Sequence, residues 1–513
     1  MSAAAEKNRQ AFIALFGNAA LADMLIATRI AVSMPASPAP RSAQLLLEVL
    51  ADSLGRLWPN IDFDGHGGEH GVRIAQEAAT SGGAPTEGIR LGWAPPYDVV
   101  VVVGSPERDH VSPTVQVGCD GWRVQFGAGA VCGEGSNPVG PAFAAALASA
   151  QVFATRFAHA LEGHRLKPFG DWSADVRALF GAPELAERPL DLEGTHFFGT
   201  GAVTHGMAWL LERWPQPIIG AAALVDADDY GSSNGQRYAF LKPGLVGASK
   251  VHTLATRLMA VHPGLLLSTH HTDMNTYCAG RGYDEKLFRI VAGLDSEEAR
   301  RQAALKDPNR TINMWTSGQY VGAGQHVPGV GQGCLFCAYP EPMAAVIDEV
   351  AEFHQQTGLR PDIVRNLLDS ARPLTAEEAS TVSANRNIPV GHILGEPLRS
   401  VLPILCATGS ITVEPGKAAV DVPFSFASLL AGASGFVMLL RDLQFGAHVS
   451  EGWNEHIFKR PSPTMMHPQG RDPLCVRCGC AEDIGQLPSE AVDAQNESSS
   501  RVGHELTGRS PPI

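Results

Sequence analysis

The chain has 513 residues, which is enough for two or three domains of typical size. Its formal net charge of -14 argues against sequence-independent binding of DNA or RNA and against docking on an anionic membrane. The first ten residues are polar and charged and contain no apolar run that leads to a cleavage site. We therefore expect a cytoplasmic protein with neither a nucleic acid nor a membrane as partner.

The first part of the chain, residues 1–166, is predicted to form an α/β lobe. Its predicted elements are, in chain order, helices over Arg9–Ala31 and Ala43–Leu57, a buried strand over Asp98–Val103, alternating strands near Val115–Phe126 and an Ala-rich helix over Ala142–Phe157. The turn after Val103 has one glycine and then a proline, and no set of acidic and cationic residues comparable to the one described below follows it. This lobe is therefore not expected to bind a nucleotide.

A glycine turn opens the next part of the chain, after a predicted linker at residues 167–188. The strand Thr195–Phe198 turns on Gly199 and Gly201 and continues into a helix. Glycines let backbone N–H groups approach a phosphate closely, and a helix N-terminus adds about half a positive charge. Thr204 replaces the third glycine of a dinucleotide-binding turn, which disfavours a dehydrogenase.

Polar residues follow the next predicted strands of the same sheet. The run Ile218–Val225 ends in Asp226 and Asp228, at the distance from the turn at which an acidic residue contacts ribose hydroxyls. The polar and cationic residues that come next suit a triphosphate; they are Asn234, Gln236, Arg237 and Lys250. Asp295 lies at the carboxyl end of the run Leu287–Leu294, where open parallel sheets bind ligands, and is a candidate magnesium ligand.

Nine cysteines in a chain expected to be cytoplasmic favour metal binding or catalysis over disulfides. Two pairs have the CxxC spacing, and each pair suits half of a tetrahedral zinc site: Cys334 with Cys337, and Cys475 with Cys478. We predict one four-thiolate zinc site, with Cys480 as a competing ligand. Two unrelated buried pairs are the alternative interpretation.

These motifs resemble those of the ThiF/MoeB and ubiquitin-activating enzyme superfamily in order and approximate spacing. The superfamily pattern is a glycine turn, an acidic-x-acidic strand end, SNxxRQ, a downstream lysine and a DxxxxR segment. The chain departs from it at Thr204, and in placing Gln236 before Arg237. The resemblance supports the zinc site, because many members carry paired CxxC motifs that clamp the adenylation domain.

The same resemblance assigns roles to the residues of the predicted nucleotide site. It implies ATP as cofactor, a phosphate turn at Gly199 and Gly201, and ribose binding by Asp226 and Asp228. It also implies magnesium on Asp295. The residues expected to offset phosphate charge are Asn234, Arg237 and Lys250.

The implied architecture is a Rossmann-like adenylation fold, in which an inactive and an active lobe form a pseudo-dimer within one chain. The expected segments are an inactive lobe (1–166), the linker (167–188), an active adenylation domain (189–470) with a helical insert (about 341–397) and a catalytic-cysteine crossover (about 398–421), a zinc-completing segment (471–484) and a disordered tail (485–513). The alternative for the first lobe is a helical and sheet domain of its own kind. Pairing of two chains as a homodimer stays open.

The apolar run Val422–Leu440 is long enough to span a membrane. Pro423, three serines and two glycines lie inside this run, and the superfamily has a buried helix near this point. We therefore predict a core helix. Just before it, Cys406 is the candidate nucleophile, because several compact ubiquitin-like-activating enzymes carry their catalytic cysteine on this crossover. An inert buried cysteine is the alternative.

The resemblance implies ATP-dependent activation of the C-terminal carboxylate of a ubiquitin-like protein. A thioester on Cys406 and transfer to a conjugating enzyme would follow. The chain is also similar to activating enzymes of bacterial Bil-type operons, which implies a role in antiphage defence. The alternatives are a sulfur-carrier adenylyltransferase of the ThiF/MoeB type and a noncatalytic scaffold that binds a ubiquitin-like protein.

Overall fold

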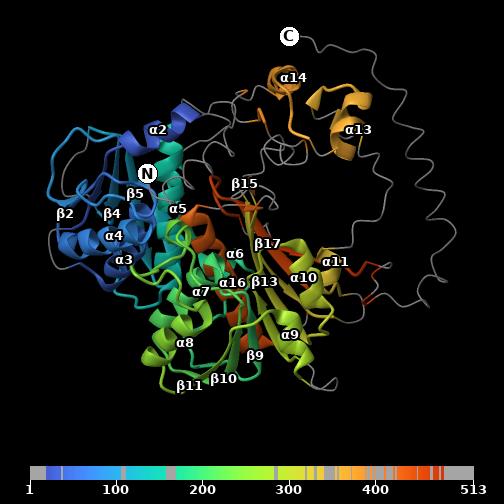
Figure 1. Cartoon of the computed structure of the whole chain (residues 1–513). Helices are drawn as coiled ribbons and strands as arrows, with labels where there is room; N and C mark the ends of the chain where they lie inside the picture. Colours follow the sequence, from blue (N-terminus) through green and yellow to red (C-terminus); the bar gives the residue numbers. More distant parts are fainter. Residues whose placement is uncertain are drawn as a thin grey trace, which may run out of the picture.

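The structure, a computed structural model, describes residues 19–478 with gaps, of which the longest are 158–168, 340–349, 399–409 and 412–419. Most of its strands belong to two large sheets, one in each half of the chain. A short antiparallel pair is separate from both sheets and joins β15 (Ser410–Ile411) to β16 (Val420–Asp421). Figure 1 shows the N-terminal lobe, in blue and cyan, packed beside the rest of the chain.

The first sheet has the strand order β3-β2-β1-β4-β5-β6-β7, and its first five strands are parallel. Its strands are β1 (Ile30–Ser33), β2 (Ile61–Asp64), β3 (Ile89–Leu91), β4 (Val99–Val103), β5 (Thr114–Asp120), β6 (Arg123–Phe126) and β7 (Trp172–Asp175). The helices of this lobe are α2 (Ala19–Ala27), α3 (Arg41–Gly55), α4 (Gly68–Ser81), α5 (Val139–Phe157) and α6 (Val176–Leu179). Strand β4 consists of five buried valines, the composition typical of a strand that is covered on both faces.

The second sheet has the order β11-β10-β9-β12-β13-β14-β17-β18, and β8 pairs with β10. It is parallel from β11 to β13 and antiparallel beyond. Its strands are β8 (Leu190–Asp191), β9 (Thr195–Phe198), β10 (Ile218–Val225), β11 (Leu265–His270), β12 (Arg289–Ala292), β13 (Arg310–Ser317), β14 (Tyr320–His326), β17 (Glu451–His456) and β18 (Met466–Pro468). The helices along it are α7 (Ala202–Arg213), α8 (Lys250–Val261), α9 (Met274–Ala279), α10 (Glu297–Ala304) and α11 (Leu335–Ala338).

Both sheets share one topology. When the strands of each lobe are numbered from β1 and from β9, the parallel part of each sheet reads 3-2-1-4-5, the order of the Rossmann fold. The prediction of an α/β protein with two Rossmann-like lobes is confirmed by these strand orders.

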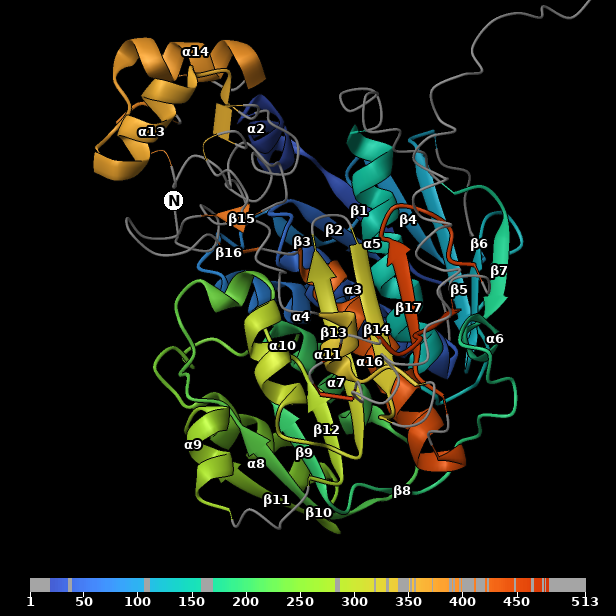
Figure 2. The same ribbon diagram turned by 90° about the vertical axis from the view of Figure 1, so that its right-hand side faces the viewer.

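Helix α16 (Ser425–Phe445) joins the two lobes, because its side chains belong to a core cluster that draws on both sheets. It packs against α7 so closely that a Cβ on Gly432 would lie 2.3 Å from the carbonyl oxygen of Val203. In Figure 2 it runs through the body of the molecule beside α7. Among the described residues it is the one helix long and apolar enough to cross a membrane, but 89% of its apolar window is buried. The prediction of a core helix is confirmed.

Two helices form a small unit of their own between β14 and α16 in the sequence. These are α13 (Pro361–Ser370) and α14 (Ala376–Arg386), and they lie beyond the two sheets in both views (Figure 1 and Figure 2). Apolar side chains of these helices form a separate cluster, which includes Val364 and Val382 together with Phe353 from the preceding segment. They fall within the region where a helical insert was expected.

Two expectations for the first lobe are wrong in detail. The helix expected to reach Ala31 ends at Ala27, and Ile30 begins the central strand β1, because this short apolar run fits both helical and strand patterns. The expected linker contains β7, which extends the first sheet at its edge. The turn after Val103 is not the counterpart of the glycine turn, because the central strand is β1 and not β4.

Candidate functional site

The glycine turn joins β9, the central strand of the second sheet, to α7. Gly199 adopts a φ of +80°, which favours glycine, and a Cβ there would lie 2.7 Å from the carbonyl oxygen of Gly293. Gly201 is the N-cap of α7 and contributes no side chain, so the backbone at the helix N-terminus can approach a ligand.

Thr204, which stands in place of the third glycine, is accommodated in this turn. Its hydroxyl donates a hydrogen bond of 2.7 Å to the carbonyl oxygen of Gly199. The space it needs comes from Gly293, where a Cβ would lie 2.1 Å from the Thr204 hydroxyl oxygen. Thr204 thus restrains the turn through this hydrogen bond, and its side chain is not among those that line the cavity beside the turn.

His205 is a local contact of the turn and not a catalytic group. Its Nδ1 lies 2.9 Å from the carbonyl oxygen of Gly201, and its Nε2 lies 2.7 Å from the hydroxyl of Tyr230. Burial lowers the pKa of His205 to about 3. The ring is thus neutral at physiological pH, with the Nδ1 proton assigned by its carbonyl acceptor.

The two aspartates after β10 have different surroundings. Asp226 accepts hydrogen bonds from the backbone N–H and the hydroxyl of Thr200, at 2.6 and 2.9 Å, and so braces the glycine turn. Asp228 is largely exposed and lies 2.7 Å from Nζ of Lys250. Of the two, Asp228 has more of its carboxylate available to a ligand.

Lys250 is the first residue of α8 and is 5% exposed. Burial opposes its charge, but Tyr238, Asp226 and Asp228 together outweigh burial and raise the pKa of Lys250 above its usual value. The lysine is therefore fully charged at physiological pH. Its ammonium group also lies 5.8 Å from the centre of the Tyr238 ring.

The segment between the two aspartates and Lys250 contains a single 3-10 turn over Asn234–Gln236. Asn234 and Arg237 line the same cavity as Lys250, and so does Tyr238. Gln236 is 1% exposed and is not among the residues that line this cavity. The inverted Gln-Arg order thus places the arginine at the cavity and the glutamine in the interior.

Asp295 and Arg300 flank the N-terminal end of α10. Asp295 is exposed and precedes the N-cap Ser296, whose hydroxyl accepts a hydrogen bond from the backbone of Ala299. Arg300 is 6% exposed and donates to Asn313 Oδ1 at 3.1 Å and to the carbonyl oxygen of Leu294 at 2.6 Å. The DxxxxR spacing therefore places a carboxylate and a guanidinium at one wall.

These residues enclose one cavity of about 530 Å³ at the carboxyl edge of the parallel strands. The predicted site residues that line it are Gly199, Gly201, Asp226, Asp228, Asn234, Arg237, Lys250 and Asp295. Sequence reasoning missed Tyr238, Asp273 and Trp315, which also line it. Trp315 and Asp273 carry no motif, and only the strand order shows that β11 and β13 end at this edge. The cavity combines a backbone turn suited to phosphates, three cationic side chains and a cluster of carboxylates.

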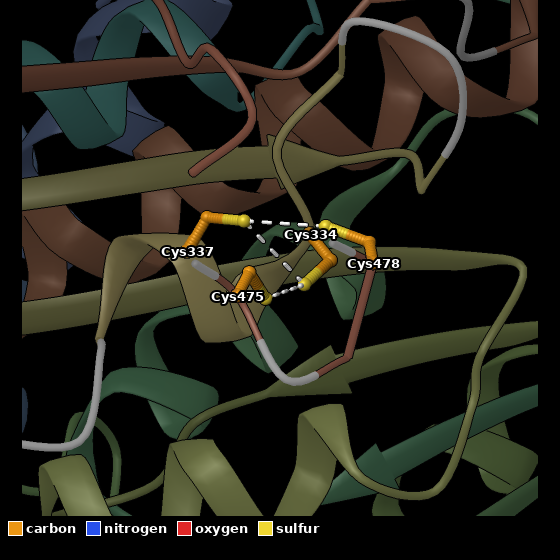
Figure 3. Close-up of side chains that lie close together, drawn as sticks. All are labelled: Cys334, Cys337, Cys475 and Cys478. Carbon is orange, nitrogen blue, oxygen red and sulfur yellow. Dashed lines mark hydrogen bonds between the residues drawn. The ribbon is translucent and has the colours of Figure 1, made fainter. Parts of the chain in front are cut away.

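The four cysteines of the two CxxC pairs converge at one point, as Figure 3 shows. Their sulfur atoms all lie within 4.8 Å of one another. The measured separations are 3.8 Å for Cys334–Cys337, 3.7 Å for Cys334–Cys475 and 3.3 Å for Cys337–Cys478. A tetrahedral zinc ion with Zn–S bonds of about 2.3 Å needs sulfurs about 3.8 Å apart, so this cluster fits zinc.

The cysteine cluster packs against the wall of the cavity. Cys334, Phe336 and Cys475 belong to an apolar cluster that includes Ala303 and Ala304 of α10. Tyr339, two residues after Cys337, has its ring 5.3 Å from the guanidinium carbon of Arg300. Its hydroxyl accepts a hydrogen bond from the Asn313 side chain at 3.0 Å. The tyrosine thus links the cluster to the cavity.

Three expectations fall outside the described residues. Cys406, the candidate nucleophile, lies in the gap 399–409, and Cys480 lies beyond residue 478. The tail at 485–513 lies there too.

Comparison with known proteins gives weak similarities. No family model matches the chain. An uncharacterized protein, y4jF, of Sinorhizobium fredii is 28% identical over 404 residues, which cover 75% of this chain and 76% of that protein. Solved structures of MccB are also similar. E. coli MccB with succinimide is 14% identical, with a TM-score of 0.34, over 60% of this chain and 70% of MccB.

For E. coli MccB with ATP, the values are 14% identity and a TM-score of 0.33 over 56% and 66% of the two chains. The microcin C7 biosynthetic enzyme MccB in complex with N-formylated MccA is 13% identical, with a TM-score of 0.33, over 65% and 75%. Similarity this weak says nothing of the substrate. The fold assignment rests on the strand orders of the two sheets.

Proposed function

We propose that this protein adenylates a carboxylate with ATP. The observation that carries the proposal is the cavity itself, which brings the glycine turn, the Lys250–Asp228 pair, Arg237 and Asp295 to the carboxyl edge of a Rossmann-like sheet. Ligands bind at this edge in open parallel sheets. Its volume of about 530 Å³ lies in the range of small-molecule and cofactor sites.

In the proposed reaction, an oxygen of the substrate carboxylate attacks the α-phosphorus of ATP. The bond from this phosphorus to the oxygen that bridges to the β-phosphorus breaks, and pyrophosphate leaves with the bonding electrons. The turn at Gly199 and Gly201 would hold phosphate oxygens through backbone N–H groups. Lys250 and Arg237 would offset the charge that develops on the leaving group, which is usually the largest catalytic contribution.

Two further groups fit this reaction. The Asp295 carboxylate is an oxygen ligand of the kind that magnesium prefers, and magnesium would neutralise charge on the phosphates. The exposed Asp228 would accept hydrogen bonds from ribose hydroxyls. Asp226 would hold the turn in place, since Thr200 already donates two hydrogen bonds to it.

The zinc site has a supporting place in this proposal. Cys334, Cys337, Cys475 and Cys478 would hold the ion, which is structural because four thiolates leave no position for a substrate. The ion would link Cys475 and Cys478, which follow β18, to the first CxxC pair at α11, here called the cysteine knuckle. Through Tyr339 it would also support Arg300 at the cavity wall.

For the substrate, we propose the C-terminal carboxylate of a ubiquitin-like protein, on the basis of the motif order. Cys406 would attack the acyl-adenylate, AMP would leave, and the resulting thioester would pass to a conjugating enzyme. Bacterial antiphage defence is the proposed setting. These steps rest on the resemblance described above, since Cys406 lies outside the described residues.

The test is a nonreducing gel of the chain incubated with ATP, magnesium and a ubiquitin-like protein from a neighbouring gene, with wild type compared to Cys406→Ala. A thiol-sensitive band that only wild type forms is expected. If neither protein forms the band while AMP and pyrophosphate are still produced, the chain is a sulfur-carrier adenylyltransferase. If wild type does not bind ATP, the adenylation proposal fails and a noncatalytic scaffold is favoured.

A further inference from the structure

The segment Asn234–Leu241, here called the phosphate segment, has one side at the cavity and the other on the N-terminal lobe. Asn234, Arg237 and Tyr238 line the cavity. Between and beyond these residues, the backbone of the segment is held by α3 and α4 of the first lobe. The first lobe therefore contacts the site from behind.

A buried ion pair at the C-terminal end of α3 contributes to this contact. Asp52 and Arg56 lie one helical turn apart and are joined by two hydrogen bonds, from Nη2 at 2.7 Å and from Nε at 3.0 Å. Their side chains are 6% and 0% exposed. Burial of two charges is costly and is compensated only when further hydrogen bonds satisfy them.

Further hydrogen bonds of this pair go to the backbone of the phosphate segment. Arg56 Nη1 donates to the carbonyl oxygen of Gly235 at 2.6 Å, and Nη2 lies 3.5 Å from that of Leu241. The backbone N–H of Phe240 donates to both carboxylate oxygens of Asp52, at 3.2 Å each. The pair thus fixes both ends of the stretch that carries Arg237 and Tyr238.

The backbone of the segment also has the features of a chain under external constraint. Phe240 has a φ of +56°, which costs free energy in a residue with a bulky side chain and persists only where the surroundings enforce it. A Cβ on Gly235 would lie 1.9 Å from the carbonyl oxygen of Ser81 at the end of α4. Ser81 also donates a hydrogen bond of 2.5 Å to the carbonyl oxygen of Leu241.

We propose that Asp52 and Arg56 are positioning residues of the ATP site, and that holding the phosphate segment is the role of the first lobe in catalysis. This inference rests on the proposed function. Arg56 does not line the cavity and does not touch the nucleotide site; it acts through the backbone of Gly235. Arg237 and Tyr238 are then presented to the phosphates in one fixed geometry.

The test is the affinity of the full chain for magnesium-ATP, measured by calorimetry, in wild type and in Asp52→Asn. ATP is an anion, so removal of a carboxylate charge should strengthen binding if electrostatics alone acted. If Asp52 instead positions the phosphate segment, Asp52→Asn should weaken binding of magnesium-ATP. We expect Kd to rise about tenfold, within the range for hydrogen bonds to charged groups.

Glu48→Gln is the matched control. Glu48 is also on α3 and also bridges the lobes, through Arg213 and the Trp209 side chain, but it does not contact the phosphate segment. The Kd of Glu48→Gln for magnesium-ATP should stay within about twofold of the wild-type value. Hydrogen exchange provides a second readout: amides of residues 234–241 should exchange faster in Asp52→Asn and at the wild-type rate in Glu48→Gln.

The outcomes separate this inference from the proposed function. Failure of wild type to bind ATP overturns the proposed function. Wild-type binding together with an unchanged or lower Kd in Asp52→Asn overturns only the positioning role. If Asp52→Asn does not fold, Ser81→Ala tests the same contact from α4, and we expect its Kd to rise by about fivefold or less. An unchanged Kd and unchanged exchange in Ser81→Ala would overturn the inference.

Discussion

Replacement of Lys250 by alanine tests the proposed chemistry most directly. Its ammonium group is nearly buried at the cavity and is held 2.7 Å from Asp228. Loss of one group that stabilises developing charge costs about 10² to 10³ in rate, or about 2.7 to 4 kcal/mol. Because Asp228 is 69% exposed, solvent screens the ion pair, and the free energy of unfolding should fall by about 1 kcal/mol or less.

The assay is ATP–pyrophosphate exchange with the ubiquitin-like substrate, at a pH between about 7 and 9. The raised pKa of Lys250 keeps it protonated there, because the charged form is present below its pKa and is lost only as pH rises through it. Lys242→Ala is the matched control. Lys242 lies in the loop before α8 and pairs with Glu77, but it is exposed and outside the cavity. Exchange in Lys250→Ala within about threefold of Lys242→Ala would refute the assigned role.

Three further predictions concern the metal, the packing and the pH dependence. Purified protein should contain one zinc ion per chain by mass spectrometry; Cys475→Ser should lose it and unfold at a lower temperature, while Cys278→Ser should retain it. In a denaturant titration, Gly432→Ala should lower the free energy of unfolding by about 1 to 3 kcal/mol, because the added Cβ clashes with α7. The control Gly129→Ala, whose Cβ meets open space, should change this free energy by less than about 0.5 kcal/mol. Burial lowers the pKa of His326 to about 3. Below pH 6.5 the unfolded state therefore binds a proton that the folded state does not bind, and the free energy of unfolding should fall as pH drops from about 6.5. The melting temperature of His326→Leu should depend less on pH than that of wild type over pH 4.5–6.5. An equal slope in both proteins would contradict this account.

Local sequence was sufficient for the glycine turn and for those cavity residues that belong to motifs. The turn at Gly199 needs only a strand, two glycines and a helix, and Asp226 follows from the next strand by the rules of parallel sheets. The cysteine cluster was also predicted, because CxxC pairs have a fixed spacing even when they are distant in the chain.

What the sequence could not show depends on tertiary contacts. Trp315 reaches the cavity because β13 ends beside β12, and Tyr339 supports Arg300 because the cysteine knuckle packs on α10. The ion pair of Asp52 with Arg56 reads in sequence as an ordinary i, i+4 pair on an exposed helix face. Only the structure shows that it is buried under another lobe.

The first lobe shares the strand order of the second but differs at the position that decides phosphate binding. In the sequence, the segment between its central strand β1 and helix α3 is Met34 to Pro40, and three of these seven residues are proline. Proline has no backbone N–H, so this segment offers fewer backbone donors to a phosphate than a segment of the same length without proline. A lobe with such a segment can still contribute to the site through its helices. Helix α3, which begins just after this segment at Arg41, carries Asp52, and Arg56 follows at its C-terminal end; both contact the phosphate segment of the other lobe. If only the second lobe binds ATP and the first lobe positions the phosphate segment, Pro40→Gly should still bind one magnesium-ATP per chain. A stoichiometry of two would show that the first lobe has a second nucleotide site.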